Sequence, residues 1–226
     1  MVKWRRCIEL YLGQTGGNMN NIQARKVISF NQEVLSIFID GRMLGDFLSA
    51  ITGDSVYKNL WCAWLLEVNQ NAWEQEGNYI WTLIENKRNC NLPILLCADD
   101  MDFWCTVVVA QVRFYNNVVV WEKVGLVTGK FDVKQWRKSG IQNIAKWCET
   151  DWNLYGETLS GLDENDKAWE EWWSEHWLDE EKRRLWNYFH PYFSDNENIT
   201  WLNCERLSFS VSGHDNCVAA FKRNSP

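Results

Sequence analysis

The chain has 226 residues, of which 46% are hydrophobic and 23% are charged, and its formal net charge at pH 7 is −7. A chain of this length buries a substantial core as one large domain or two small ones, so its folding requires neither disulfides nor a structural metal. No basic stripe accompanies the negative charge. This argues against direct binding to nucleic acid and favours a cationic partner, with solubility alone as the other explanation.

The first 26 residues differ in character from the rest of the chain. They contain five basic residues and one acidic residue, and the stretch 13–21 is polar and rich in Gly and Asn. We expect a loose N-terminal extension over residues 1–26, followed by one domain over residues 27–226. The start does not have the pattern of a signal peptide, and no apolar run approaches the ~20 residues of a membrane helix. The sequence therefore predicts a cytoplasmic protein without membrane contact.

The cysteines are numerous but are not arranged as a recognisable site. All eight lack a CxxC partner, and several lie in apolar runs such as 61–62 and 95–97. This pattern is typical of buried thiols in a reducing cytosol. A disulfide framework is the alternative that the even number leaves open, although a core of this size does not need one.

The segment 27–66 predicts three elements. A run of branched apolar residues predicts a strand over 34–39, and Asp40-Gly41 supplies a turn. Apolar residues then recur at helical spacing over 44–51, so a helix should follow. The apolar run over 60–66 fits either a buried strand or a helix, because periodicity alone does not distinguish them.

The middle of the chain predicts a β-hairpin. A strand over 93–97 leads into an acidic bend over 98–102, and β-branched runs over 105–115 and 118–124 then flank Asn116-Asn117. Asn tolerates the positive φ angles that a tight turn requires, so these two residues are suited to joining the two strands. We expect this hairpin to lie centrally in a sheet.

Helical spacing replaces the strand pattern after Gly129. One helical segment covers 131–147, where Ser139-Gly140 is a point at which it would divide in two. A second segment starts near Asp163 or Asp166, either of which would cap its N-terminus, and it should end at His190-Pro191.

The C-terminal region predicts a second hairpin. Alternating residues predict a strand over 205–211, the stretch 213–216 a turn, and the apolar run 217–221 a returning strand. With no internal repeat and no linker, these elements predict an α+β fold. We expect a single domain with a central, mainly antiparallel sheet and packed helices.

The chain has 16 tryptophans. Most lie in apolar runs or at helical spacing, which favours an aromatic core over a ligand-binding surface. One group is surrounded by acids instead, and for these a surface role is equally well supported: Trp169, Trp172, Trp173 and Trp177.

The polar residues do not form a known catalytic motif. Asp99, Asp100 and Asp102 are close enough in sequence to bind a divalent cation or to share a proton, but no calcium-loop pattern surrounds them, so a solvated or partner-facing turn is the preferred interpretation. The three histidines are far apart and lack metal-ligand spacing. No phosphate loop or nucleophile motif is present either. We therefore expect no catalytic residues, no metal and no cofactor.

In these respects the chain resembles the immunity proteins of bacterial polymorphic-toxin and contact-dependent inhibition systems, which are small, acidic proteins without catalytic motifs. The resemblance implies a protein that covers the active site of a basic toxin domain, with carboxylates steering the encounter and aromatic residues holding the complex. The residues expected to bind the partner are Asp99, Asp100, Asp102, Glu170, Glu171, Trp172 and Glu175.

Two other functions remain open. An enzyme acting on a neutral or cationic substrate such as a glycan would use paired carboxylates as acid and base and tryptophans as stacking platforms. A scaffold subunit would oligomerise through exposed tryptophan. Two opposed carboxylates in a deep pocket flanked by Asp102 would favour the enzyme.

Overall fold

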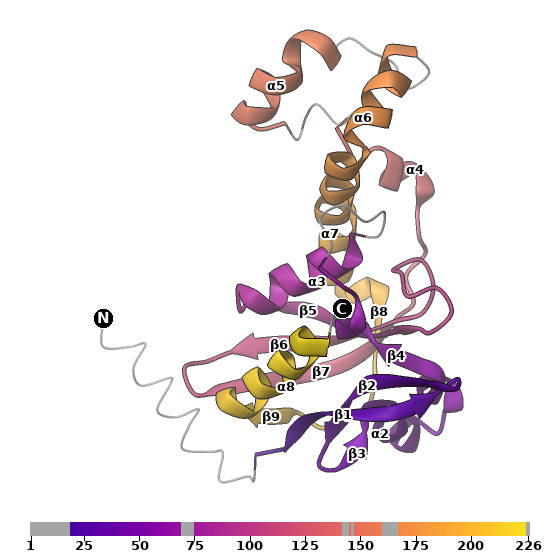
Figure 1. Cartoon of the computed structure of the whole chain (residues 1–226), viewed down its shortest axis with the longest axis vertical. Coiled ribbons are helices and arrows are strands. Elements are labelled where there is room, and N and C mark those ends of the chain that lie inside the picture. Colours follow the sequence, from indigo (N-terminus) through magenta and orange to yellow (C-terminus); the bar gives the residue numbers. More distant parts are fainter. Residues whose placement is uncertain (1–18, 69–74, 142–144, 146, 160–166, 225–226) are drawn as a thin grey trace.

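The computed structural model describes residues 19–68, 75–141, 145, 147–159 and 167–224. Two antiparallel sheets and their packed helices form a body, and a helical arm projects from it (Figure 1). The predicted α+β fold is confirmed. No helix among these residues has both the length and the apolar character needed to cross a membrane.

The larger sheet has six strands and contains the predicted hairpin. Its order is β4-β5-β6-β7-β8, with β9 also paired to β7. The hairpin strands β6 and β7 lie at its centre, as expected, and their apolar runs over 107–110 and 119–121 are buried. The strands are β4 Leu60–Cys62, β5 Cys90–Cys97, β6 Val107–Phe114, β7 Val118–Val127, β8 Ile199–Trp201 and β9 Leu207–Ser210.

The smaller sheet corrects the expected N-terminal boundary. Strand β1, Ile22–Ser29, pairs along its whole length with β2, Gln32–Ile39, which in turn pairs with the short β3, Arg42–Met43. Residues 22–26 therefore belong to the fold and not to a loose extension, and Ile22 is buried in the core. Residues 1–18, the rest of the expected extension, lie outside the described residues.

The predicted turn and helix after β2 are both present. Asp40 and Gly41 have φ angles of 51° and 80°, and the helix α2, Leu44–Thr52, follows β3. The ambiguous run over 60–66 contains both kinds of structure, because β4 continues directly into a 3₁₀ turn over Ala63–Leu65.

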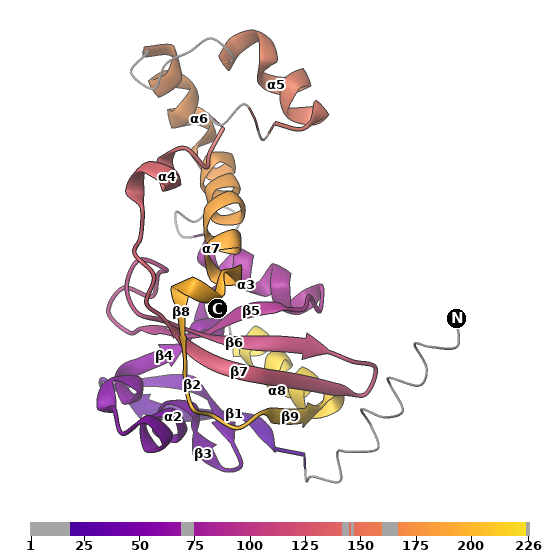
Figure 2. The same ribbon diagram turned by 180° about the vertical axis from the view of Figure 1, so that it is seen from behind.

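The C-terminal prediction was wrong. Residues 211–224 form the helix α8, Val211–Asn224, where a turn and a strand were expected. Three residues at helical spacing, His214, Cys217 and Phe221, point into the core and are each no more than 2% exposed. The Ser210 hydroxyl accepts a hydrogen bond from the Gly213 amide at 3.0 Å, which caps the helix start. Helix α8 contacts β1, β7 and β9 (Figures 1 and 2).

The helical region after β7 also differs from the prediction. In place of one helix over 131–147, a short helix α4, Val133–Arg137, ends just before the expected break at Ser139-Gly140. The helix α5, Glu149–Leu159, was not predicted. The next helix, α6, spans Lys167–Arg184 and has a non-helical residue at His176 that kinks it. The expected caps Asp163 and Asp166 lie outside the described residues.

His190-Pro191 does not end the helical run as expected. A π-helical turn over Leu185–Phe189 follows α6 directly and leads into α7, His190–Ser194. Proline is tolerated there because it occupies the first turn of α7, where no helical partner is required from its missing N–H.

The predicted aromatic core is confirmed for the tryptophans that face inward. Trp64, Trp81, Trp121 and Trp136 are buried, and Trp64 contacts Trp121 edge to face with ring centroids 6.5 Å apart. The α3 helix, Glu76–Glu85, contributes Trp81 and packs against β5. A second aromatic group joins the sheet to the base of the arm: Phe103, Trp104, Phe131, Trp136, Tyr188, Phe189 and Phe193.

Candidate functional site

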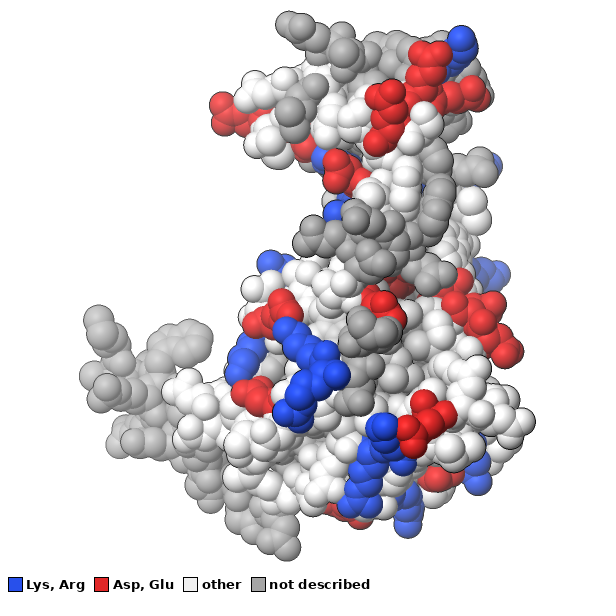
Figure 3. All heavy atoms as spheres, viewed as in Figure 1, with Lys and Arg blue, Asp and Glu red and all other residues white. Residues whose placement is uncertain are grey.

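The candidate partner-binding site is the pair of helices α5 and α6, which we call the acidic arm. It extends away from the sheets, with α5 and the first half of α6 at its far end (Figures 1 and 2). The two helices contain nine acidic and four basic residues. In the space-filling view, acidic groups gather over this end, whereas both signs of charge are mixed over the body (Figure 3).

One buried carboxylate fixes the base of the arm. Glu180 is 1% exposed, accepts a hydrogen bond from the Ile141 amide at 2.7 Å and pairs with Arg184 at 2.8 Å. Gly140 lies against it, and a Cβ at that position would overlap the carboxylate. The Glu180 carboxylate therefore attaches the segment after α4 to α6, and both of its oxygens have a hydrogen-bond partner.

An ion pair joins the two helices of the arm. Asp151 of α5 accepts a hydrogen bond from Arg183 of α6 at 2.6 Å, and its other oxygen accepts from the Cys148 amide at 2.9 Å. The hydrogen bond from Arg183 holds the pKa of Asp151 well below its usual range. Both side chains are largely screened from water, with 9% and 22% exposure for Asp151 and Arg183.

Four of the predicted partner-binding residues lie together on the arm. Glu170, Glu171 and Glu175 are exposed on α6, and Trp172 lies between them, half-buried. The Trp172 ring stacks on His176 at 4.8 Å and meets the edge of Tyr155 at 5.4 Å. Carboxylates and a flat apolar ring therefore share this part of the surface. The side chains of Trp169 and Trp173 lie outside what the structure describes.

The other three predicted residues lie elsewhere. Asp99, Asp100 and Asp102 follow β5 and belong to the body, so the structure does not bring them together with the acids of α6 (Figure 1). Asp99 and Asp100 are exposed. The Asp102 carboxylate accepts from the Trp104 amide at 2.9 Å and from the Cys105 amide at 3.2 Å, and it serves to shape the turn.

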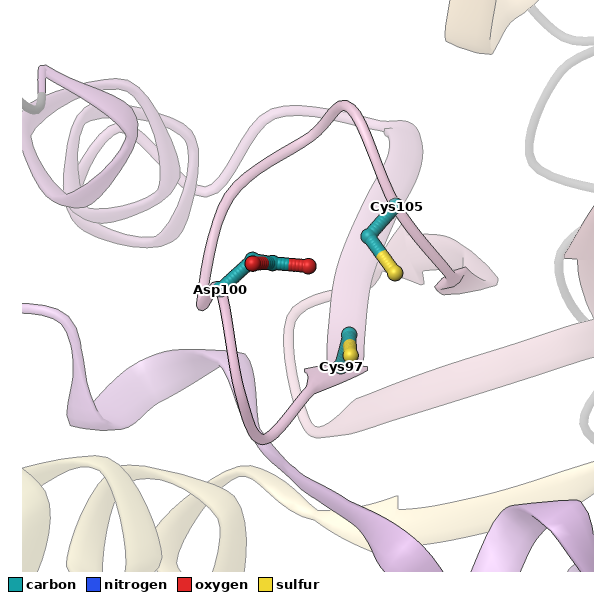
Figure 4. A group of neighbouring side chains, drawn as sticks. All are labelled: Cys97, Asp100 and Cys105. Carbon is teal, nitrogen blue, oxygen red and sulfur yellow. The ribbon is translucent and has the colours of Figure 1, made fainter.

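Sequence reasoning missed what surrounds Asp100. The thiols of Cys97 and Cys105 and the Asp100 carboxylate converge, with their potential ligand atoms all within 4.8 Å of one another (Figure 4). The hydrogen bond with Cys97 raises the pKa of the Cys105 thiol. The pairing of β5 with β6 predicts this meeting, because antiparallel neighbours joined by a short turn bring the end of one strand next to the start of the other.

The prediction of buried thiols holds for only part of the chain. Cys62 and Cys217 are 1% and 2% exposed, and burial raises the pKa of Cys217 to about 12. Cys105 and Cys148 are exposed, which contradicts the prediction for these two. Every cysteine among the described residues is a free thiol, so a disulfide framework does not form in this part of the chain.

A pocket of about 360 Å³ lies between α3 and the lower part of α6. Among the described residues, its lining includes Trp81, Trp186 and Lys182, with Glu85 as the one acid. Asp102 does not line this pocket. The described part of the lining therefore does not provide the two opposed carboxylates that glycoside hydrolysis would require.

Comparisons with family models, with curated proteins and with solved structures gave no significant match to the chain.

Proposed function

We propose that this chain is a binding protein of the immunity type, which neutralises a basic toxin domain by covering its active site. The observation that supports the proposal is the acidic arm, a projecting pair of helices that exposes Glu170, Glu171 and Glu175 beside Trp172. Exposed carboxylates on a projection attract a cationic surface over about a Debye length, roughly 8 Å at physiological ionic strength, and so speed productive encounter.

The aromatic residues supply the short-range part of the interaction. Trp172 is partly exposed and already held by stacking on His176, and Trp152 on α5 is 48% exposed. Aromatic rings that are ordered before binding bury a large area at a small cost in side-chain entropy. We expect the two rings to anchor the partner once the carboxylates have oriented it.

The arm is held in place before any partner arrives. The Asp151–Arg183 pair connects its two helices, and Glu180 connects it to the segment that follows α4. A preorganised surface avoids the ordering cost that a flexible segment pays on binding. This rigidity is what an inhibitor needs to block an active site in one fixed pose.

The test is a growth-rescue experiment with the proteins that the adjacent genes encode. A product that arrests growth when made alone is produced in cells together with the full chain, either unchanged or carrying Glu170→Lys, Glu171→Lys and Glu175→Lys. We expect the unchanged chain to restore growth and the arm variant to fail. A chain that gives no protection in either form contradicts the immunity function.

A matched variant separates local from overall charge. Glu33→Lys, Glu197→Lys and Glu205→Lys change the net charge by the same amount at exposed positions of the body. This variant should still protect the cells. In stopped-flow association with the purified toxin domain, only the arm variant should lose the salt dependence of the on-rate. Equal effects of the two variants would mean that the arm is not the binding site.

A further inference from the structure

The turn between β5 and β6 brings two thiols and a carboxylate to one point, and this convergence is independent of the acidic arm. Cys97 ends β5, Cys105 precedes β6, and Asp100 lies on the turn between them (Figure 4). Their potential ligand atoms lie within 4.8 Å of one another. In a tetrahedral zinc site, with Zn–S about 2.3 Å and Zn–O about 2.0–2.2 Å, such atoms are roughly 3.5–3.8 Å apart.

The backbone of the turn sets the positions of all three residues. The Cys97 amide donates to the Thr106 carbonyl at 3.0 Å, and the Met101 amide donates to the Cys97 carbonyl at 2.9 Å. The Asp102 carboxylate accepts hydrogen bonds from two backbone amides, one of which is that of Cys105. The three ligand side chains are not needed for these bonds, so they are available to a bound ion.

The donor set decides which ion would bind. Two thiolates are soft ligands that select zinc or copper(I) over magnesium and calcium, and a carboxylate is a common additional ligand of zinc. Asp102 is not part of this convergent group, and one of its carboxylate oxygens accepts two backbone hydrogen bonds that shape the turn. Asp100 has no such role and points toward the thiols (Figure 4).

We propose that Cys97, Asp100 and Cys105 form a zinc site with three protein ligands and one solvent-facing position. Asp100 and Cys105 are exposed and Cys97 is half-buried, so zinc enters from solvent and keeps one water. The small contraction from the present distances is made by rotation of the two exposed side chains, while the turn keeps its shape. Zinc bound there connects the end of β5 to the start of β6.

The first test measures zinc binding to the full, reduced chain. The chain is mixed with Zn²⁺ alone, freed of excess metal on a desalting column, and its zinc content is determined. We expect one zinc per chain, and replacement by Co²⁺ should give the thiolate-to-metal absorption band of two cysteine ligands. Absence of retained zinc, or a cobalt spectrum without thiolate bands, would overturn the proposal.

Variants locate the site. Cys105→Ala and Asp100→Asn should each weaken zinc binding, and for Cys105→Ala the loss should exceed about 100-fold, because even changes outside the ligand shell of a metal cost 10–100-fold. Cys148→Ala is the matched control, since Cys148 is an exposed thiol on the arm side of the molecule. Unchanged affinity in Cys105→Ala, or an equal loss in Cys148→Ala, would contradict the assignment.

A measurement on the unchanged chain avoids any effect of substitution on folding. Zinc should protect Cys105 and Cys97 from alkylation and leave Cys148 reactive, as read by peptide mapping. Alkylation of all three at the same rates with and without zinc would overturn the site. If Cys97 and Cys105 are instead recovered as a disulfide that zinc does not prevent, the pair is a redox pair and the proposal is wrong.

Discussion

Gly140 lies directly against the buried carboxylate of Glu180, so that any side chain at position 140 would occupy the space of the carboxylate oxygens. The same carboxylate accepts hydrogen bonds from the Ile141 amide and the Arg184 guanidinium. Tight packing and satisfied charge therefore coincide at the base of the acidic arm. This contact between a residue without a side chain and a buried acid joins the segment after α4 to α6.

We predict that Gly140→Ala destabilises the chain by about 1–3 kcal/mol, the usual cost of forcing an extra group into a packed site. Glu180→Ala should cost more, about 3–5 kcal/mol, because it leaves Arg184 without its partner in a largely buried position. Urea denaturation of each variant measures both free energies of unfolding.

The double variant tests whether the two effects have one cause. With the Glu180 carboxylate removed, the added methyl of Gly140→Ala has room, so its cost in that background should fall well below its cost alone. Additive free energies would show that Gly140 is required for another reason, such as its backbone conformation.

The second prediction concerns the Asp151–Arg183 pair. Asp151→Ala removes both the cross-link to α6 and the acceptor for the Cys148 amide, so α5 should separate from α6 while the sheets stay intact. Hydrogen exchange should accelerate in the amides of α5 and stay unchanged in β6 and β7. Lys167→Ala is the control, because its ion pair with Glu171 is exposed to water and should contribute little. Equal protection of α5 in both variants would contradict the role of Asp151.

Local patterns in the sequence predicted the centre of this fold well. The β-branched runs around Asn116-Asn117 formed the central hairpin, and the apolar run before Asp40-Gly41 formed a strand and a turn. These elements follow from short-range preferences of the backbone, which tertiary contacts here reinforce, although neither Asn116 nor Asn117 has the positive φ angle expected of the turn. The error at the C-terminus has the opposite origin. An apolar run over 217–221 fitted a strand, but His214, Cys217 and Phe221 form one helical face that the sheet buries.

The candidate sites were less predictable because they depend on long-range geometry. The sequence identified Glu170, Glu171 and Glu175 as an exposed acidic group, and it identified Asp100 as one of three acids in a turn. It did not predict that α6 projects from the body, nor that Gly140 packs against Glu180, 40 residues away, because both depend on contacts between distant segments. The meeting of Cys97 with Cys105 likewise required the register of β5 on β6.

The third prediction concerns His214, which titrates inside the core. Its ring is 1% exposed and lies against Trp64 and Phe114, and this burial lowers its pKa to about 4 even though Asp215 lies 3.8 Å away and opposes the shift. The unfolded chain binds a proton at its ordinary pKa of about 6.5. The contribution of His214 to the free energy of unfolding is therefore complete above pH 6.5 and is lost as the pH falls toward 4.

The His214→Leu variant should remove this loss. As the pH falls from 6.5 to 4, its free energy of unfolding should rise relative to that of the unchanged chain, by up to the order of 3 kcal/mol at the acidic end. Urea denaturation at a series of pH values measures the difference. The neighbouring rings of Trp64 and Phe114 favour an apolar replacement, so the variant should fold at pH 7. Identical pH profiles for the two chains would show that His214 is not the group responsible.

The fourth prediction is a contribution of opposite sign from Glu181 on α6. Burial raises the pKa of Glu181 to about 7, although Arg184 opposes the shift. The unfolded carboxyl titrates near 4.5. A raised pKa in the folded state means that this stabilising contribution is present below pH 4.5 and is lost as the pH rises toward 7.

Glu181→Gln stays neutral throughout, so this variant should gain stability relative to the unchanged chain as the pH rises from 4.5 to 7. Glu175→Gln, at an exposed position on the same helix, should show no such relative gain. The Glu181 contribution opposes that of His214 over the same pH range. The free energy of unfolding of the unchanged chain should therefore vary less with pH than that of His214→Leu, which falls as the pH rises, or that of Glu181→Gln, which rises.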